Sequence, residues 1–175
     1  MTVVTISGLP GSGTTTISTL LEKKTKIPYI YAGEIFRKMA KKYGMSLEDF
    51  GNYCEKNKEI DEELDRNQLK ILEKGNVILE GRIAGWIAYR NNINSLKVIL
   101  EADLDTRAKR IVKRENGDIN KRKQEIEKRE KSEATRYKNY YDIDLFDTSI
   151  YDLVIDSSDK NPEEIVEIIL KKIKK

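Results

Sequence analysis

The order of apolar and polar residues along the chain predicts strands that alternate with helices. Short apolar runs with the length of buried strands occur at residues 3–6, 29–31, 76–80, 96–100 and 151–155. Between them, apolar residues recur at helical spacing in residues 14–24, 59–73 and 103–114. This alternation is typical of a parallel sheet covered by helices on both faces, with ligands bound at the carboxyl ends of the strands. We therefore predict a single α/β domain.

Local chemistry marks where further helices begin and end. Ser46-Leu47-Glu48-Asp49 has the pattern of a capping box and predicts the start of a short helix. Asn161-Pro162-Glu163-Glu164 offers an N-cap, a proline at the first helical position and early acidic residues, which predicts the last helix. Asn116-Gly117-Asp118 interrupts a charged helical stretch, so we expect a turn there between two helices.

Composition narrows the functional classes. The chain has 175 residues, enough for one domain with a substantial core. Its net charge of +3 is close to balance and implies neither a nucleic-acid nor a membrane partner. No apolar run approaches the ~20 residues that a membrane span needs, and no signal peptide is apparent. We expect a monomer without nucleic-acid or membrane partners.

Cysteine and histidine usage excludes several kinds of chemistry. Cys54 is the only cysteine, which excludes an internal disulfide and fits a reducing cytoplasm. The chain has no histidine, so histidine acid–base catalysis and most zinc sites are excluded. We therefore expect Cys54 to be a buried apolar residue rather than a nucleophile.

The segment Gly8-Leu9-Pro10-Gly11-Ser12-Gly13-Thr14-Thr15 follows the first predicted strand. It has the spacing of a phosphate-binding loop, except that Thr14 stands where the lysine belongs. Consecutive backbone N–H groups at the start of a helix bind phosphate, and glycines let the backbone approach the anion. Thr15 falls at the position whose hydroxyl holds magnesium, whereas Thr14 brings a hydrogen bond but no charge. The alternative is a glycine-rich turn that binds nothing.

The segment Glu80-Gly81-Arg82 ends the third predicted strand beside this loop. A carboxylate at that edge suits magnesium or its waters, and an arginine there can bind phosphate through two hydrogen bonds. The alternative is a surface charge pair that contributes little.

A basic stretch in the second half of the chain contains Arg107, Arg110, Arg114, Arg129 and Arg136. Arg129, Glu133 and Arg136 have the spacing of one helix face. Phosphoryl transfer favours cations that close over the triphosphate, while the alternative is a solvated helix hairpin. A nucleic-acid interface is disfavoured because acidic residues interrupt the stretch and no aromatic platform accompanies it.

Together these motifs resemble a known family. They are Gly8–Thr16, Gly33-Glu34-Ile35-Phe36-Arg37, Asp65-Arg66-Asn67-Gln68-Leu69, Glu80-Gly81-Arg82, Lys128-Arg129-Glu130-Lys131-Ser132-Glu133, Arg136-Tyr137 and Asp142-Ile143-Asp144. Their order over the whole chain is similar to that in archaeal-type cytidylate kinases. The resemblance implies a three-layer P-loop nucleoside monophosphate kinase fold with a five-stranded parallel sheet flanked by helices. It also implies an NMP-binding part at about residues 33–66 and a lid at about residues 110–130.

The same resemblance implies transfer of the ATP γ-phosphate to CMP and dCMP, with Mg²⁺ as cofactor. It assigns the ATP site to Gly8, Leu9, Pro10, Gly11, Ser12, Gly13, Thr14, Thr15, Thr16 and Arg110. It assigns the acceptor site to Gly33, Arg37, Arg66, Arg82, Arg129, Glu133 and Arg136, of which Arg82, Arg129, Glu133 and Arg136 are the catalytic group. It places magnesium at Thr15 and Glu80.

Two other functions remain open at this point. Adenylate kinases share the architecture, so the acceptor can be AMP, UMP or a small metabolite. A non-catalytic ATP-binding switch that lost activity with its lysine is the other possibility. The arginines at several separate positions favour the enzyme, because a binding module has no use for an acceptor clamp.

Overall fold

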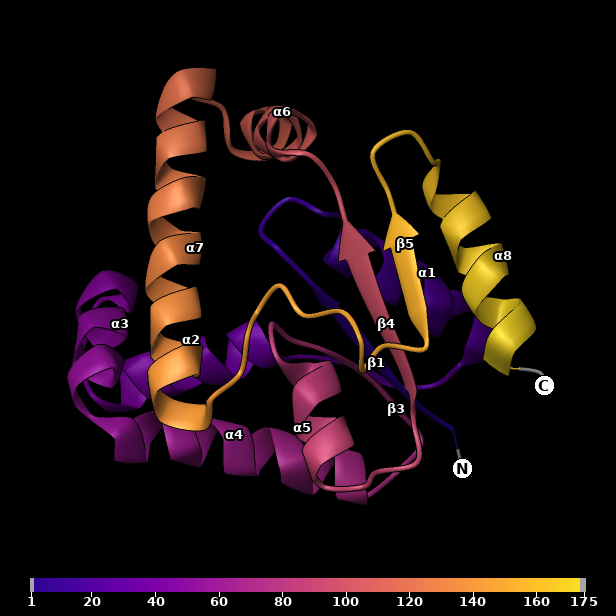
Figure 1. Cartoon of the computed structure of the whole chain (residues 1–175), viewed down its shortest axis with the longest axis horizontal. Coiled ribbons are helices and arrows are strands. Elements are labelled where there is room, and N and C mark those ends of the chain that lie inside the picture. Colours follow the sequence, from indigo (N-terminus) through magenta and orange to yellow (C-terminus); the bar gives the residue numbers. More distant parts are fainter. Residues whose placement is uncertain (1, 174–175) are drawn as a thin grey trace.

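The computed structural model describes residues 2–173 and contains five strands and eight helices (Figure 1). The strands are β1 Val3–Gly8, β2 Tyr29–Tyr31, β3 Val77–Glu80, β4 Leu96–Glu101 and β5 Leu153–Asp156. The helices are α1 Thr14–Thr25, α2 Ala32–Lys42, α3 Leu47–Lys56, α4 Lys58–Glu73, α5 Ala84–Arg90, α6 Leu104–Glu115, α7 Ile119–Tyr141 and α8 Pro162–Ile173.

The strands form one parallel sheet in the order β2-β3-β1-β4-β5. β1 lies in the centre, where Val4 is opposite both Ile78 and Leu96. Chain order reverses at β1, since β3 lies on one side of it and β4 on the other. A ligand site is expected at such a switch point, outside the carboxyl ends of the strands.

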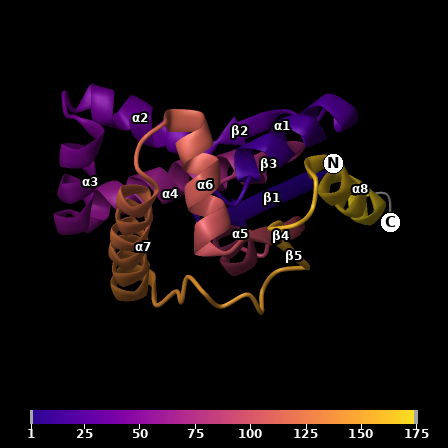
Figure 2. The ribbon, with the colours of Figure 1, turned by 90° about the horizontal axis from the view of Figure 1, so that it is seen from above.

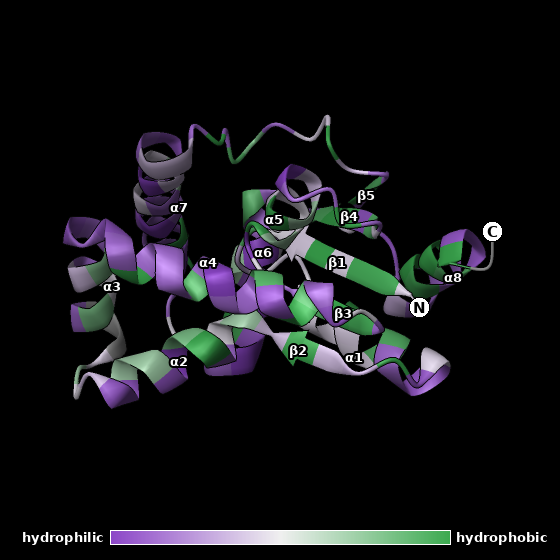
Figure 3. Ribbon diagram, turned by 90° about the horizontal axis from the view of Figure 1, so that it is seen from below, coloured by the Kyte–Doolittle hydropathy of each residue, from purple (hydrophilic) through white to green (hydrophobic). Residues whose placement is uncertain are grey.

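Successive residues of the central strands point to opposite faces, and both faces are buried. Val4 and Ile6 are 0% exposed and pack with residues of α1 and α8. Val3 packs on the other face with residues of α4 and α5. Burial on both faces explains why the strands read as continuous apolar runs, as the sequence predicted. Figure 3 shows β1 as mainly hydrophobic between helices of mixed character.

Residues 32–64 carry a small apolar core of their own. Helices α2, α3 and α4 contribute Met39, Ala40, Phe50, Cys54 and Leu64 to it. Cys54 is 0% exposed, so the prediction of a buried apolar cysteine is confirmed. A separate core lets this part pack as a unit beside the sheet.

Helices α6 and α7 are joined by the predicted turn and lie across each other rather than side by side along their lengths (Figures 1 and 2). Asn116 and Gly117 have positive φ angles, and Asp118 caps α7 by accepting a hydrogen bond from the Lys121 N–H. α7 lies on the opposite side of the molecule from α8 (Figure 2). Its far end contacts α3, since the Tyr140 hydroxyl donates to the carbonyl oxygens of Cys54 and Glu55. One helix therefore touches both α6 and the core of residues 32–64.

Some predicted boundaries were wrong for physical reasons. Asn76 has a φ of 51°, which a strand residue does not adopt, so β3 begins at Val77. The Tyr151 N–H bonds back to Thr148 in a turn, and β5 therefore begins at Leu153. Helices α2 and α5 were not predicted from the sequence. Within the described residues, no helix has the length and apolar character needed to cross a membrane.

Candidate active site

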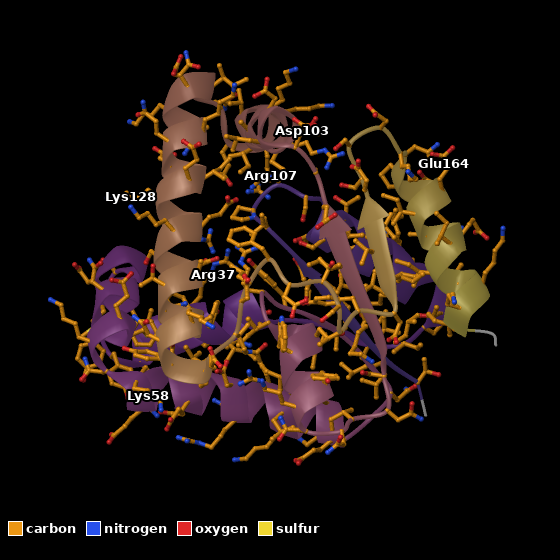
Figure 4. The ribbon with its side chains drawn as sticks, viewed as in Figure 1. Arg37, Lys58, Asp103, Arg107, Lys128 and Glu164 are labelled. Atoms are coloured by element: carbon orange, nitrogen blue, oxygen red, sulfur yellow. The ribbon has the colours of Figure 1, made fainter. Side chains whose placement is uncertain are left out.

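A cavity of about 700 Å³ opens at the carboxyl ends of β1 and β3. Its walls come from the loop after β1, from α2 and α4, from the end of β3 and from α7. The cavity therefore lies at the switch point of the sheet, between the small core of residues 32–64 and α7. Figure 4 labels Arg37, one of its lining residues, beside α7.

The phosphate loop, residues 8–15, has the backbone that the motif predicts. Gly11 and Gly13 have φ angles of 85° and 95°, which favour glycine. Gly13 is the N-cap of α1 and no side chain caps that end. The free N–H groups and the positive end of the helix dipole therefore remain available to an anion.

Threonine hydroxyls from this loop converge on Glu80. The Thr14 and Thr15 hydroxyls donate to Glu80 Oε1 at 2.6 and 2.9 Å. The Tyr29 hydroxyl, from β2, donates to Glu80 Oε2. Burial and the Glu80 hydrogen bond raise the pKa of Tyr29 well above its ordinary value, so the phenol stays a donor. All three donors are neutral groups.

Glu80 and Thr15 fit a magnesium ion. Glu80 is 4% exposed, and no cationic side chain of the described residues lies within ion-pair distance of it. A buried carboxylate without a cationic partner is costly, which favours a bound cation there. Residues 2–173 hold no cluster of three acidic or sulfur ligands, so a metal here would draw further ligands from the nucleotide and water.

Glu133 of α7 holds two arginines on the opposite wall. Arg82 Nε donates to Glu133 Oε2 at 2.6 Å, and Arg129 Nε donates to Glu133 Oε1 at 2.8 Å. Arg82 also donates to the Gly8 carbonyl oxygen, which brings it against the phosphate loop. Burial by itself would raise the pKa of Glu133, but the two guanidinium groups hold it below its ordinary value. Glu133 is therefore ionised and fixes both cations beside the loop.

The far end of the cavity, away from the loop, carries a polar face of α4. Asp61, Asp65 and Gln68 line it, and Arg136 of α7 lies opposite. Arg136 Nε is 3.0 Å from Asp61 Oδ2, and Gln68 Nε2 donates to Asp65 Oδ1 at 3.3 Å. Gln68 Oε1 is buried without a hydrogen-bond partner. This end therefore offers acceptors and donors for a polar ligand.

Asp65→Asn is expected to stabilise the protein at pH 8 and not at pH 4. Burial raises the pKa of Asp65 from 3.8 to about 6. The folded state thus favours the protonated form of Asp65. The free energy of unfolding therefore carries no penalty from Asp65 below about pH 4, and it falls as the buried carboxyl ionises when the pH rises through about 6. Asparagine avoids the cost of the ionised form, so we expect a gain of about 1–2 kcal/mol at pH 8. Thermal unfolding at both pH values measures it.

Glu59→Gln on the exposed face of the same helix is the control for this test. An equal effect of Asp65→Asn at pH 4 and pH 8 would contradict the assignment of the raised pKa.

Arginines from α6 contact the outer carbonyls of the phosphate loop. Arg107 Nη1 donates to Pro10 O at 3.3 Å and also pairs with Glu130 of α7. Arg110 Nη1 lies 3.4 and 3.3 Å from the carbonyl oxygens of Gly11 and Ser12, and Arg110 Nη2 donates to Ser157 O at 2.5 Å. Figure 4 labels Arg107 between α6 and this loop. These contacts with its carbonyl oxygens stabilise the conformation of the loop.

The structure brings most of the predicted site residues to one cavity. Those that line it are Gly8, Leu9, Pro10, Gly11, Thr14, Thr15, Gly33, Arg37, Glu80, Arg82, Arg129, Glu133 and Arg136. Four predicted site residues do not line the cavity: Ser12 and Gly13 of the loop, Thr16 in the first turn of α1, and Arg110, which contacts the loop carbonyls.

The structure does not bring Arg66 to this cavity. Its side chain is 60% exposed, lies 3.8 Å from Glu62 and lines a separate cavity of about 240 Å³. Because neighbouring helix positions are rotated by about 100°, Asp65 faces the main cavity and Arg66 does not. Arg66 therefore stays a predicted member of the acceptor clamp that does not line the main cavity in this structure.

Several residues that line the cavity are not among the site residues assigned from the sequence. The helical spacing i, i+4, i+7 places Asp61, Asp65 and Gln68 on one polar face, which the sequence pattern could have predicted. Tyr29 carries no local signal, since it reads as an ordinary strand residue. Arg114 and Lys128 also line the cavity.

Comparison with known proteins shows the family of the chain. A model of the cytidylate kinase-like family matches residues 3–159. The cytidylate kinase of Methanocaldococcus jannaschii is 49% identical over 168 residues, which are 95% of this chain and 94% of that protein. The cytidylate kinase of Pyrococcus horikoshii is 45% identical over 95% of this chain and 85% of its own length.

Solved structures with lower identity show the fold alone. An uncharacterized protein from Eubacterium ventriosum superimposes with a TM-score of 0.74 at 20% identity, covering 99% of both chains. Shikimate kinase from Aquifex aeolicus does so with a TM-score of 0.61 at 18% identity, covering 98% of this chain and 96% of its own. The predicted P-loop kinase fold is thereby confirmed, and the chain belongs to the cytidylate kinase-like family.

Proposed function

We propose that this protein is a cytidylate kinase, which transfers the γ-phosphoryl group of ATP to CMP or dCMP and releases ADP with CDP or dCDP. The observation that carries the proposal is the single cavity with two chemically different ends. The phosphate loop forms one end, and the far end of Asp61, Asp65, Gln68 and Arg136 forms the other. Arg82, Arg129 and Glu133 lie between them. Relatives at up to 49% identity over nearly the whole chain bear the same name.

The donor nucleotide binds at the phosphate loop. The N–H groups at the start of α1 hold the phosphates, and Arg107 and Arg110 keep the loop in its binding conformation. Thr15 and Glu80 would hold a magnesium ion beside these phosphates, which would supply charge neutralisation there. We therefore propose ATP as the phosphoryl donor and Mg²⁺ as its metal ion.

The reaction needs charge stabilisation rather than a strong base. An acceptor phosphate is already ionised at neutral pH, so it attacks the γ-phosphorus in line without losing a proton first. Arg82 and Arg129, fixed by Glu133, face the place where negative charge develops. Closure of the lid, proposed at residues 110–130, would exclude water and prevent hydrolysis. Arg37 of α2 also lines the cavity, with its Cζ 5.4 Å from the centre of the Tyr31 ring, and would bind the acceptor phosphate.

The far end suits cytosine. The cytosine 4-amino group donates two hydrogen bonds, while its N3 and O2 accept. Asp61, Asp65 and the unpartnered Gln68 Oε1 offer acceptors for the amino group, and Arg136 offers donors for N3 and O2. Uracil presents the opposite pattern at positions 3 and 4 and would leave these groups unpaired. A site of this kind rejects the wrong partner because the unpaired buried groups are costly.

Acceptor-dependent ADP release measures the proposal directly. With ATP and Mg²⁺, we expect CMP and dCMP to support turnover, and UMP and AMP to have kcat/KM values lower by about 10²-fold or more. Preference for AMP or UMP would overturn the acceptor assignment. ATP binding without release of ADP on adding any acceptor would identify the chain as an ATP-binding switch instead. We also propose that the protein acts in the cytoplasm as a monomer.

A further inference from the structure

Glu80 is a buried carboxylate that hydroxyl groups alone hold in place. It is 4% exposed and accepts hydrogen bonds from Thr14, Thr15 and Tyr29. Two other buried carboxylates that line this cavity have a cation beside them. Glu133 has Arg82 and Arg129, and Asp61 has Arg136. Glu80 thus has no cationic partner in the described part of the chain.

Thr14 occupies the position where this loop ordinarily has its lysine. Its hydroxyl is 2.6 Å from Glu80 Oε1, so a lysine at the same place would bring an ammonium group into reach of both Glu80 and the bound phosphates. Such a cation would neutralise part of the charge that a metal ion otherwise neutralises. Threonine donates a hydrogen bond to Glu80 but has no positive charge, so it does not compete with a metal ion for that carboxylate.

Tyr29 fixes the second oxygen of the same carboxylate from the neighbouring strand. Tyr29 lies opposite Ile78 in the register of β2 with β3. Ile78 precedes Glu80 by two residues, so the two side chains lie on the same face of the sheet. Tyr29 packs among the apolar residues between the sheet and α1. Its hydroxyl therefore reaches Glu80 Oε2 from a rigid element. With both oxygens fixed, the carboxylate cannot rotate away from the phosphate loop.

We propose that Thr14 and Tyr29 are positioning residues that hold Glu80 free of any protein cation, so that the metal–nucleotide complex supplies its counter-charge. The inference rests on the proposed function for the identity of the nucleotide, ATP. It explains how the loop works without its lysine: tight nucleotide binding here depends more on the divalent metal than it would with lysine at residue 14. Hydrogen bonds to a metal ligand commonly change metal affinity by about 10–100-fold, which sets the size of the effect.

Binding measurements without an acceptor test the inference. Calorimetric titration gives ATP affinity with and without Mg²⁺, and Mn²⁺ binding to the protein–ATP complex is measured by electron paramagnetic resonance. Tyr29→Phe and Thr14→Val are each expected to weaken Mn²⁺ binding about 10-fold and to change metal-free ATP affinity by less than about 2-fold. Thr14→Lys is expected to raise metal-free ATP affinity about 10-fold and to reduce the gain from Mg²⁺ by a similar factor.

Two variants serve as controls. Thr14→Ser keeps the hydroxyl and should keep wild-type metal dependence. Tyr43→Phe removes a tyrosine hydroxyl from the small core, where its ring contacts Phe50 and Tyr53, and should also keep it. Thermal unfolding without ligand shows whether each variant is folded, and Thr14→Val carries the test should Tyr29→Phe not fold.

The outcomes separate this inference from the proposed function. Mn²⁺ affinities of Tyr29→Phe and Thr14→Val equal to that of Tyr43→Phe would overturn it, as would a Thr14→Lys protein whose metal-free ATP affinity is unchanged. The expected metal effects together with no CMP-dependent ADP release would support the positioning of Glu80 and contradict only the proposed acceptor.

Discussion

Arg129→Ala is expected to lower kcat with CMP by about 10²–10³-fold while leaving the fold intact. Arg129 faces the cavity from α7, and its side chain is 61% exposed, so little packing is lost with it. Its only ion-pair partner among the described residues is Glu133. A cation that stabilises charge in the transition state is commonly worth this factor in kcat. Steady-state kinetics with ATP and CMP measure it.

Lys131→Ala is the matched control, because Lys131 is an exposed cation on the same helix and does not line the cavity. It should keep wild-type kcat and KM. A near-wild-type rate for Arg129→Ala would remove Arg129 from the catalytic group. A raised KM for CMP at unchanged kcat would show that Arg129 binds the ground state and the transition state equally.

Glu133→Gln is expected to destabilise the protein by about 3 kcal/mol. Arg82 and Glu133 side chains are 14% and 12% exposed, so removing the carboxylate leaves a largely buried guanidinium group without its partner. For a chain of this length the cost lowers Tm by roughly 6–12 °C. Bound nucleotide phosphates can replace the lost negative charge, so the difference should shrink with ATP and CMP present. Thermal unfolding with and without nucleotides measures both effects.

The pH dependence of the same variant tests the cause. Because the arginines hold the pKa of Glu133 below its ordinary value of 4.5, its stabilising contribution is present above that pH and lost as the pH falls below it. The stability gap between wild type and Glu133→Gln should therefore narrow in acid. Glu127→Gln, at an exposed position of α7, should be neutral throughout. A Glu133→Gln protein as stable as this control would contradict the buried ion pair.

The missing lysine changes how the phosphate loop is understood. Thr14 brings no positive charge to the loop, whereas Arg82 and Arg129 lie on the opposite wall of the cavity. The structure adds that Thr14 is bonded to Glu80 rather than directed only at phosphate. Threonine at this position thus affects the carboxylate as well as the nucleotide.

Local sequence determined the elements whose signals are local. β1 is a run of apolar residues followed by glycines. α8 begins at Pro162, directly after Asn161, whose side chain accepts a hydrogen bond from the Glu164 N–H as predicted. α5 escaped prediction because it is short and buried on nearly all sides, so it has no polar face to reveal a helical period. α2 escaped because it follows β2 directly, with Tyr31 as its N-cap and no intervening turn.

The sequence by itself determined that the chain has a phosphate loop, a carboxylate and an arginine at the end of β3, and arginines on a charged helix. Only the tertiary structure decided which side chains meet. Tyr29 and Glu80 are 51 residues apart, as are Arg82 and Glu133, and pairings over such distances depend on how strands and helices pack. The motif at residues 65–68 illustrates the same limit. Whether Asp65 or Arg66 faces the cavity depends on the rotation of α4, which the burial of Leu64 and Leu72 sets.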